Sequence, residues 1–186
     1  MKKVYVFLAE GFEEMEAVTP VDLLRRIPEG VVDIRLVSVT GDKAVTGAHG
    51  ITYMADLLFE EIEDDADMLV LPGGMPGTTN LMAHEGLAEL LVKHYNDRKW
   101  VAAICAAPMV LGALGIVMGR WATIYPGMEE YLVGADISKE EVCVSGNVIT
   151  SKAPGTAIPF ALKLIEILVS ESYAEHIKKD IVFQQG

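Results

Sequence analysis

The chain has 186 residues, which suits one domain of ordinary size, and 51% of them are apolar, which is enough for a sizeable core. Its 27 acidic residues outnumber its 15 basic ones, and the formal net charge of −12 argues against nucleic acids and anionic membranes as partners. From the length we expect a single domain over residues 1–186. Two cysteines make no disulfide framework in a chain of this length, so we expect the protein in a reducing cytoplasm.

Strand-like runs alternate with helical patterns along the chain. The apolar run that begins at Val4 predicts a buried strand and not a signal peptide, because the run is short and acidic residues follow it immediately. One face of a later helix carries leucines together with His94, and we expect His94, like His84, to lie on the helix surface or half packed. The expected elements, in chain order, are a strand at 4–9, a helix at 14–26, a strand at 32–39, short paired strands at 44–47 and 51–55, a strand at 68–74, a helix at 80–97, a strand at 100–104 followed by a helix, a hairpin at 142–151, a helix at 157–169 and a short helix with a ragged end at 171–186.

Residues 100–119 carry no charge over the length of a membrane span. Pro108, three glycines and a thiol near the start argue against a span. The first five residues suit a buried strand and the remainder suits a buried helix, and these two elements of an α/β core produce the same hydropathy signal. We therefore expect no membrane segment.

The alternation predicts the α/β class, with a mostly parallel sheet covered by helices on both faces. Ligands of such sheets bind beyond the carboxyl ends of the strands, which directs attention to residues 9–11, residues 72–74 and Cys105. The acidic run at 60–67 lacks the glycine and the spaced ligands of a calcium loop. We predict neither a metal nor a cofactor.

The stretch VAAICAAPMV, residues 101–110, places Cys105 where the strand is expected to stop and the helix to start. That is the topology of a nucleophile elbow, in which a sharp turn exposes one side chain above the sheet. Free backbone N–H groups at the start of the helix would stabilise a thiolate and lower the pKa of Cys105. The alternative is a buried structural cysteine. A catalytic role would require neighbouring groups that activate the thiol.

The two other strand ends supply candidate partners. Gly73 and Gly74 let the backbone approach a ligand closely, and with the amide of Ala106 they can hold an oxyanion; a plain tight turn is the alternative. The stretch EGFEEMEAV carries several acids after the first strand, and one of them, protonated because burial raises its pKa, would donate a hydrogen bond to the thiolate. Such a pair shares one proton. The spacing does not choose between Glu13 and Glu16.

Four segments in order, EGFEEMEAVTPVDLLRR, LVLPGGMPGTTNL, VAAICAAPMVL and ITSKAPGT, resemble the ThiJ/PfpI superfamily, in the branch that contains the Parkinson-disease-associated protein deglycase. The resemblance covers about residues 3 to 170. It implies a flavodoxin-like three-layer sandwich, usually a homodimer. It also implies that Cys105 is the reactive cysteine, that Glu16 is the acid bonded to it, and that Gly74 and Ala106 are the amide donors.

The chain departs from the superfamily at two positions. The hydrolytic branch usually has histidine after the nucleophile, where this chain has Ala106, and many relatives have histidine where this chain has Tyr125. A Cys–His protease triad is therefore disfavoured. The hydroxyl of Tyr125 can still donate a hydrogen bond, with packing as the alternative role.

Three functions compete on this reading. The first is an enzyme whose Cys105 adds to a small carbonyl substrate such as methylglyoxal, or to glycated groups. The second is a redox sensor or stress chaperone that works through oxidation of Cys105. The third is a peptidase or amidase.

Overall fold

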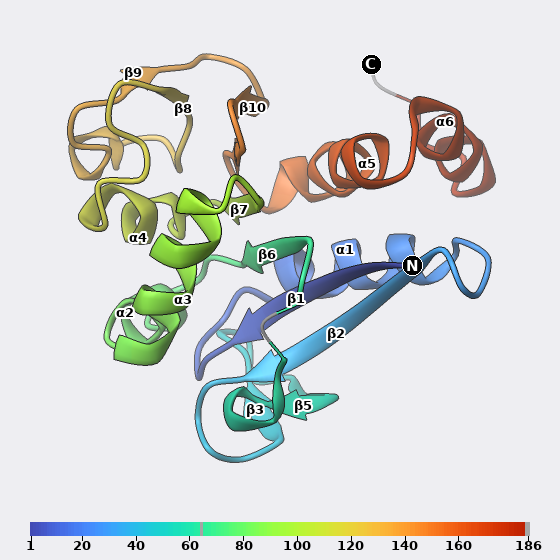
Figure 1. The fold of residues 1–186 in the computed structure, drawn as a ribbon, viewed down its shortest axis with the longest axis horizontal. Helices are drawn as coiled ribbons and strands as arrows, with labels where there is room; N and C mark the ends of the chain where they lie inside the picture. Colours follow the sequence, from blue (N-terminus) through green and yellow to red (C-terminus); the bar gives the residue numbers. More distant parts are fainter. Residues whose placement is uncertain (64, 185–186) are drawn as a thin grey trace.

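A seven-stranded sheet forms the centre of the computed structural model, which describes residues 1–63 and 65–184 (Figure 1). The pair formed by residues 142–145 and 148–151, at one edge of the sheet, is antiparallel, and every other neighbouring pair is parallel. In spatial order the strands are β10 (Val142–Ser145), β11 (Val148–Ser151), β7 (Trp100–Ile104), β6 (Met68–Leu71), β1 (Lys2–Leu8), β2 (Val32–Ser38) and β5 (Leu57–Leu58).

Helices cover both faces of this sheet (Figure 1). One face carries α1 (Glu14–Arg25), α5 (Ala157–Leu168) and α6 (Glu171–Asp180), and the other carries α2 (Gly77–Met82), α3 (Glu85–Asn96) and α4 (Pro108–Ala113). The alternation along β1 divides the core, because Val4 and Val6 pack on the first face and Tyr5 and Phe7 on the second. The predicted three-layer α/β sandwich with a mostly parallel sheet is confirmed.

Short elements complete the described chain. The predicted hairpin of β3 (Ala44–Thr46) and β4 (Thr52–Met54) is present and antiparallel. The sequence pattern missed β5 and a pair of two-residue strands, because segments this short carry no periodicity. The remaining elements are β8 (Trp121–Ala122), β9 (Asp136–Ile137) and the short 3₁₀ helices η1 (Phe59–Glu61), η2 (Glu129–Tyr131) and η3 (Pro154–Thr156).

Two helix predictions needed correction. The helix expected at 80–97 is two helices, α2 and α3, because the side chain of His84 caps the second one by accepting a hydrogen bond from the Leu87 amide at 3.0 Å. The apolar run after Cys105 is helical only to the end of α4. Among the described residues, no helix is both long enough and apolar enough to cross a membrane.

Two predictions fall partly outside the described residues. In the acidic run, position 64 lies outside them; the exposed side chains of Glu63 and Asp65 form surface ion pairs with Lys3. At the ragged end, residues 185 and 186 lie outside them, and the helix predicted there is α6.

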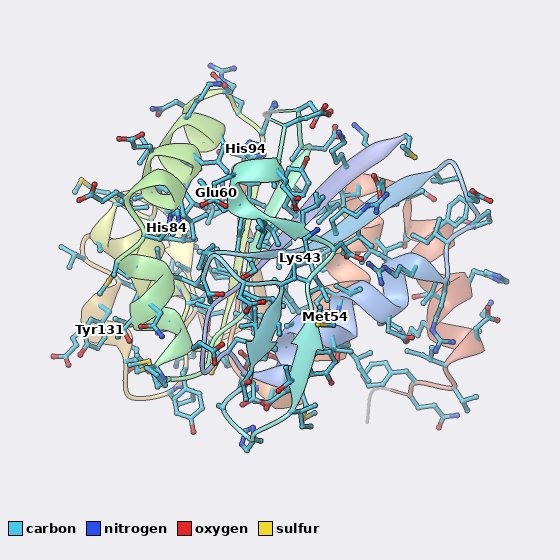
Figure 2. All side chains as sticks on the ribbon, turned by 90° about the horizontal axis from the view of Figure 1, so that it is seen from below. Lys43, Met54, Glu60, His84, His94 and Tyr131 are labelled. Atoms are coloured by element: carbon cyan, nitrogen blue, oxygen red, sulfur yellow. The ribbon has the colours of Figure 1, made fainter. Side chains whose placement is uncertain are left out.

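His94 is buried, and the expectation of a surface or half-packed side chain is wrong. It lies in the last turn of α3, at the far end from His84 (Figure 2), and is 2% exposed. Its ring donates to the backbone of Asp67, while Nε2 has no partner among the described residues. Burial, assisted by the charge of Lys99, lowers the pKa of His94 to about 4. His94 lies on the leucine face of the helix, so the sequence pattern predicted its helix face correctly and its degree of burial wrongly.

This burial predicts a pH-dependent stability. In the unfolded chain His94 takes up a proton below about pH 6.5, whereas the folded protein resists protonation down to about 4. The free energy of unfolding should therefore fall as the pH drops through this window, by up to about 3 kcal/mol. In His94→Gln, which keeps a donor for Asp67, urea unfolding between these pH values should show a smaller decline. The exposed His176 serves as the matched control, because His176→Gln should leave the decline unchanged.

Candidate active site

The chain turns sharply at Cys105, between β7 and α4. Cys105 has a φ of 63°, in the left-handed region that a residue with a side chain rarely occupies. Both of its backbone groups are held, since its N–H donates to Ser151 O at 2.9 Å and its carbonyl accepts from the Tyr125 N–H at 2.8 Å. Its side chain is 9% exposed. A strained backbone that a neighbouring strand and a loop hold in place fits the predicted nucleophile elbow.

Glu16 meets this cysteine from the first turn of α1. Its side chain is fully buried, and Oε2 accepts a hydrogen bond from the Gly73 N–H at 2.8 Å. Oε1 is buried and has no nitrogen or oxygen partner among the described residues. The Cys105 thiol interacts with this carboxyl group. A buried carboxyl with one unsatisfied oxygen next to a thiol is arranged to exchange a proton with it.

The environment changes the acidity of both groups. Burial, with a further contribution from the charge of Glu13, raises the pKa of Glu16 to about 7. Burial and then the charge of Glu16 raise the pKa of Cys105 to about 12, although the amides of Ala106 and Gly74 act in the opposite direction. The expected lowering of the Cys105 pKa is therefore wrong for the thiol beside an ionised Glu16, because burial and charge outweigh two amides. As a coupled pair, the two groups keep one shared proton between these two pH values.

The glycines after β6 allow this contact. A Cβ at Gly73 would lie 2.7 Å from Cys105 Cβ and 2.7 Å from Glu16 Oε2, so only glycine fits between the two. The amide of Gly73 is committed to Glu16, whereas those of Gly74 and Ala106 interact with the sulfur. Of the predicted donors, Gly74 and Ala106 are thus available for an oxyanion, and Gly73 positions the acid.

Gly73→Ala should separate the pair. The added methyl group has no space between Cys105 and Glu16, so one of them must move by more than a few tenths of an ångström. We expect alkylation of Cys105 at neutral pH to change at least about tenfold while the fold is retained, since a displaced acid no longer shares the proton of the thiol. Mass spectrometry of alkylated protein measures this. Gly155→Ala, at a position with open space around it, is the control.

Tyr125 stands at the edge of the site. Its backbone is bonded to Cys105, but its side chain is 45% exposed, and no described residue accepts a hydrogen bond from its hydroxyl. A cavity of about 400 Å³ between β10, α5 and α6 has other lining residues. That cavity is therefore separate from the elbow, and Tyr125 is tied to the elbow through its backbone.

A second cluster adjoins the site, and sequence reasoning missed it because it joins segments about 35 residues apart. The Glu14 carboxylate accepts hydrogen bonds from the His49 backbone at 2.8 Å and from the Ile51 backbone at 3.5 Å, and Oε2 lies 2.8 Å from His49 Nδ1. Burial alone would raise the pKa of Glu14, but these bonds lower it overall.

Among the described residues, Glu13, Glu14 and His49 place metal-ligand atoms within 4.8 Å of one another. The backbone donors around Glu14 and the positive end of α1 already compensate the carboxylate charge. The cluster is thus accounted for as a hydrogen-bonded clasp between α1 and the β3–β4 hairpin.

Comparisons with known proteins find relatives over most of the chain. A sequence profile of the DJ-1/PfpI family matches residues 2–167. "Protein DJ-1 homolog B" of Arabidopsis thaliana is 36% identical over 98% of this chain, which spans only 42% of that protein's length. A protein of Pyrococcus abyssi named as a deglycase is 33% identical over 89% of this chain and 99% of its own. The structure of oxidized Toxoplasma gondii DJ-1 superimposes with a TM-score of 0.93 at 34% identity, covering 100% of both chains.

Proposed function

Because this chain belongs to the DJ-1/PfpI family, we propose that it is a cysteine-dependent enzyme that converts small α-oxoaldehydes such as methylglyoxal into hydroxy acids. The observation that carries the proposal is the contact between a strained cysteine and a fully buried acid. A pKa of about 7 for Glu16 suits a group that accepts and returns a proton near neutral pH. The name of the Pyrococcus relative supports enzymatic activity within the family.

The proposed reaction begins with addition of the thiol to the aldehyde. The sulfur of Cys105 forms a bond to the aldehyde carbon as its proton passes to Glu16, and the carbonyl electron pair moves onto oxygen. The amides of Gly74 and Ala106 hold that oxygen while it carries negative charge. We assign to the hydroxyl of Tyr125, whose side chain is exposed, a hydrogen bond to the neighbouring ketone oxygen. The product of this step is a hemithioacetal.

A proton shift then completes the conversion. Glu16 first gives the proton taken from the thiol to the hemithioacetal oxygen and becomes a carboxylate, which then removes the hydrogen on the carbon attached to sulfur while the ketone oxygen takes up a proton from solvent. Glu16 returns the removed proton to the neighbouring carbon as the hemithioacetal hydroxyl releases its own proton to solvent, which leaves a thioester of the hydroxy acid. Water cleaves the thioester and restores the thiol. In sum, methylglyoxal and water become lactate, with no net change in oxidation. The same addition to a glycated amine would be the first step of deglycation.

Enzymatic assay tests the proposal. Purified protein should form lactate from methylglyoxal, measured with a lactate-specific detection step, and Cys143→Ser should form it at the same rate. Cys143 is the matched control, since it is also buried and free but lies on β10 away from Glu16. Lactate at the level of a heat-denatured sample would contradict the proposed activity.

The second candidate function is a redox sensor or stress chaperone, which the oxidized state named for the Toxoplasma gondii relative favours. Oxidation of Cys105 to sulfenic and then sulfinic acid would place new oxygens near the amides of Gly74 and Ala106. Mild peroxide should then modify Cys105 well before Cys143, as measured by peptide mass spectrometry. Equal modification of the two thiols would speak against it.

We also propose a homodimer in a reducing cytoplasm. The clasp places α1 beside the β3–β4 hairpin, and both carry exposed apolar side chains, Met15 on α1, Met54 on β4 (Figure 2) and Ile51 just before it. A second copy would cover them. Light scattering at several protein concentrations should give twice the mass of 20.2 kDa.

A further inference from the structure

A third acid, Glu13, lies next to the elbow through its backbone. Glu13 precedes α1, and its N–H donates to Gly73 O at 2.9 Å. A Cβ built on Gly74 would lie 2.4 Å from the same Glu13 nitrogen, so this residue lies against the glycine whose amide faces the sulfur. Its side chain is only 13% exposed. The charge of Glu13 reaches the reactive pair, because it contributes to the raised pKa of Glu16.

Besides the backbone donors to Glu14 and Glu16, one weakly basic side chain offsets the charge of these acids. His49 Nδ1 lies 3.6 Å from Glu13 Oε2 and 2.8 Å from Glu14 Oε2. Within residues 1–63 and 65–184, no lysine or arginine forms an ion pair with Glu13, Glu14 or Glu16. The hydrogen bond to Glu14, followed by the charges of Glu13 and Glu14, raises the pKa of His49. The imidazole is 66% exposed, so water and salt screen its charge.

We propose that the approach to Cys105 selects by charge, so that neutral carbonyl compounds reach the sulfur and anionic ones of the same size are rejected. Glu13 is the specificity-determining residue, and His49 offsets part of its negative charge. The Gly74 and Ala106 amides accommodate one negative oxygen, which the reacting carbonyl itself supplies. A second negative charge on the substrate would face the carboxylate of Glu13 in a site of low dielectric. As a statement about substrates, the inference rests on the proposed function and restricts it to uncharged oxoaldehydes.

Alkylation tests the selection without any turnover. Iodoacetamide and iodoacetate are nearly equal in size and differ by one negative charge. The ratio of their rates at Cys105, measured by peptide mass spectrometry in Cys143→Ser protein, cancels the fraction of thiolate, which is the same for both reagents. We expect this ratio to exceed that of glutathione by at least about tenfold, and to fall toward it as salt rises from about 0.02 M to about 0.5 M.

Two substitutions assign the effect. Glu13→Gln should lower the ratio of the two alkylation rates several-fold, because it removes a negative charge that repels iodoacetate. His49→Ala should raise the ratio, because it removes the imidazole that offsets this charge. A wild-type ratio equal to that of glutathione, or a ratio that Glu13→Gln leaves unchanged, would overturn the proposal. The opposite sign expected for His49→Ala keeps the test decisive if Glu13→Gln folds poorly. Failure of lactate formation with a high alkylation ratio would reject the enzymatic function and leave the charge selection standing.

Discussion

Cys105→Ser is expected to slow the formation of lactate from methylglyoxal by at least about 10³-fold. A serine hydroxyl is far less acidic than a thiol, so the carboxylate of Glu16, whose pKa is about 7, is too weak a base to ionise it. Serine is nearly the same size and retains the same backbone strain, so the fold should be unchanged. The rate of lactate formation at saturating methylglyoxal is the measurement.

Two comparisons make this result specific to the elbow. Thermal unfolding of Cys105→Ser should match that of the wild type, which separates loss of the nucleophile from loss of structure. Cys143→Ser should retain the full rate. If Cys105→Ser formed lactate at the wild-type rate, the carbonyl chemistry would reside elsewhere in the molecule.

Glu16→Gln is expected to make the protein more stable above neutral pH and at the same time much less active. Because burial raises the pKa of Glu16 from 4.5 to about 7, the folded protein holds a proton there that the unfolded chain releases. Stability from this group is fully present below about pH 4.5 and is lost as the pH rises to about 7. Glutamine is never ionised, so the variant avoids this loss and should gain about 1–3 kcal/mol at pH 8.

Urea unfolding of both proteins at about pH 4.5 and about pH 8 measures this gain, which should appear only at the higher pH. A variant less stable than the wild type at both pH values would contradict the assigned burial cost. Such a cost, carried at neutral pH, is typical of a residue that is kept for function.

The loss of activity in the same variant follows from the shared proton. Glutamine cannot take up the proton of the thiol, so lactate formation should fall at least about 100-fold. Alkylation of Cys105 above about pH 7 should instead become faster, because the negative charge of Glu16 no longer raises the pKa of the thiol. In the wild type, alkylation should rise as the pH passes about 7, where the pair loses its first proton, and this step should be absent from Glu16→Gln. Alkylation of the variant that is no faster than that of the wild type above about pH 7 would contradict the assigned effect of the Glu16 charge on the pKa of Cys105.

The sequence by itself determined the architecture and the location of the site. Apolar runs of strand length alternate with helical spacing, and because parallel strands end at one edge of the sheet, the pattern brought Cys105, the glycines after β6 and the acids after β1 together. The predicted bounds of β7 and of the β10–β11 hairpin were correct, because charged or turn residues mark most of their ends.

Only the tertiary structure decided what depends on neighbours from distant segments. Spacing left Glu13 and Glu16 open and the resemblance implied Glu16; the coordinates bury Glu16 against the sulfur while Glu13 turns toward His49. The acidity of the thiol was predicted in the wrong direction, because local sequence reveals the amides of an elbow but not the burial and charge around it. The depth of His94 was missed for the same reason. Periodicity fixes which face of an element turns inward, whereas solvation and electrostatics are set by whatever packs against that face.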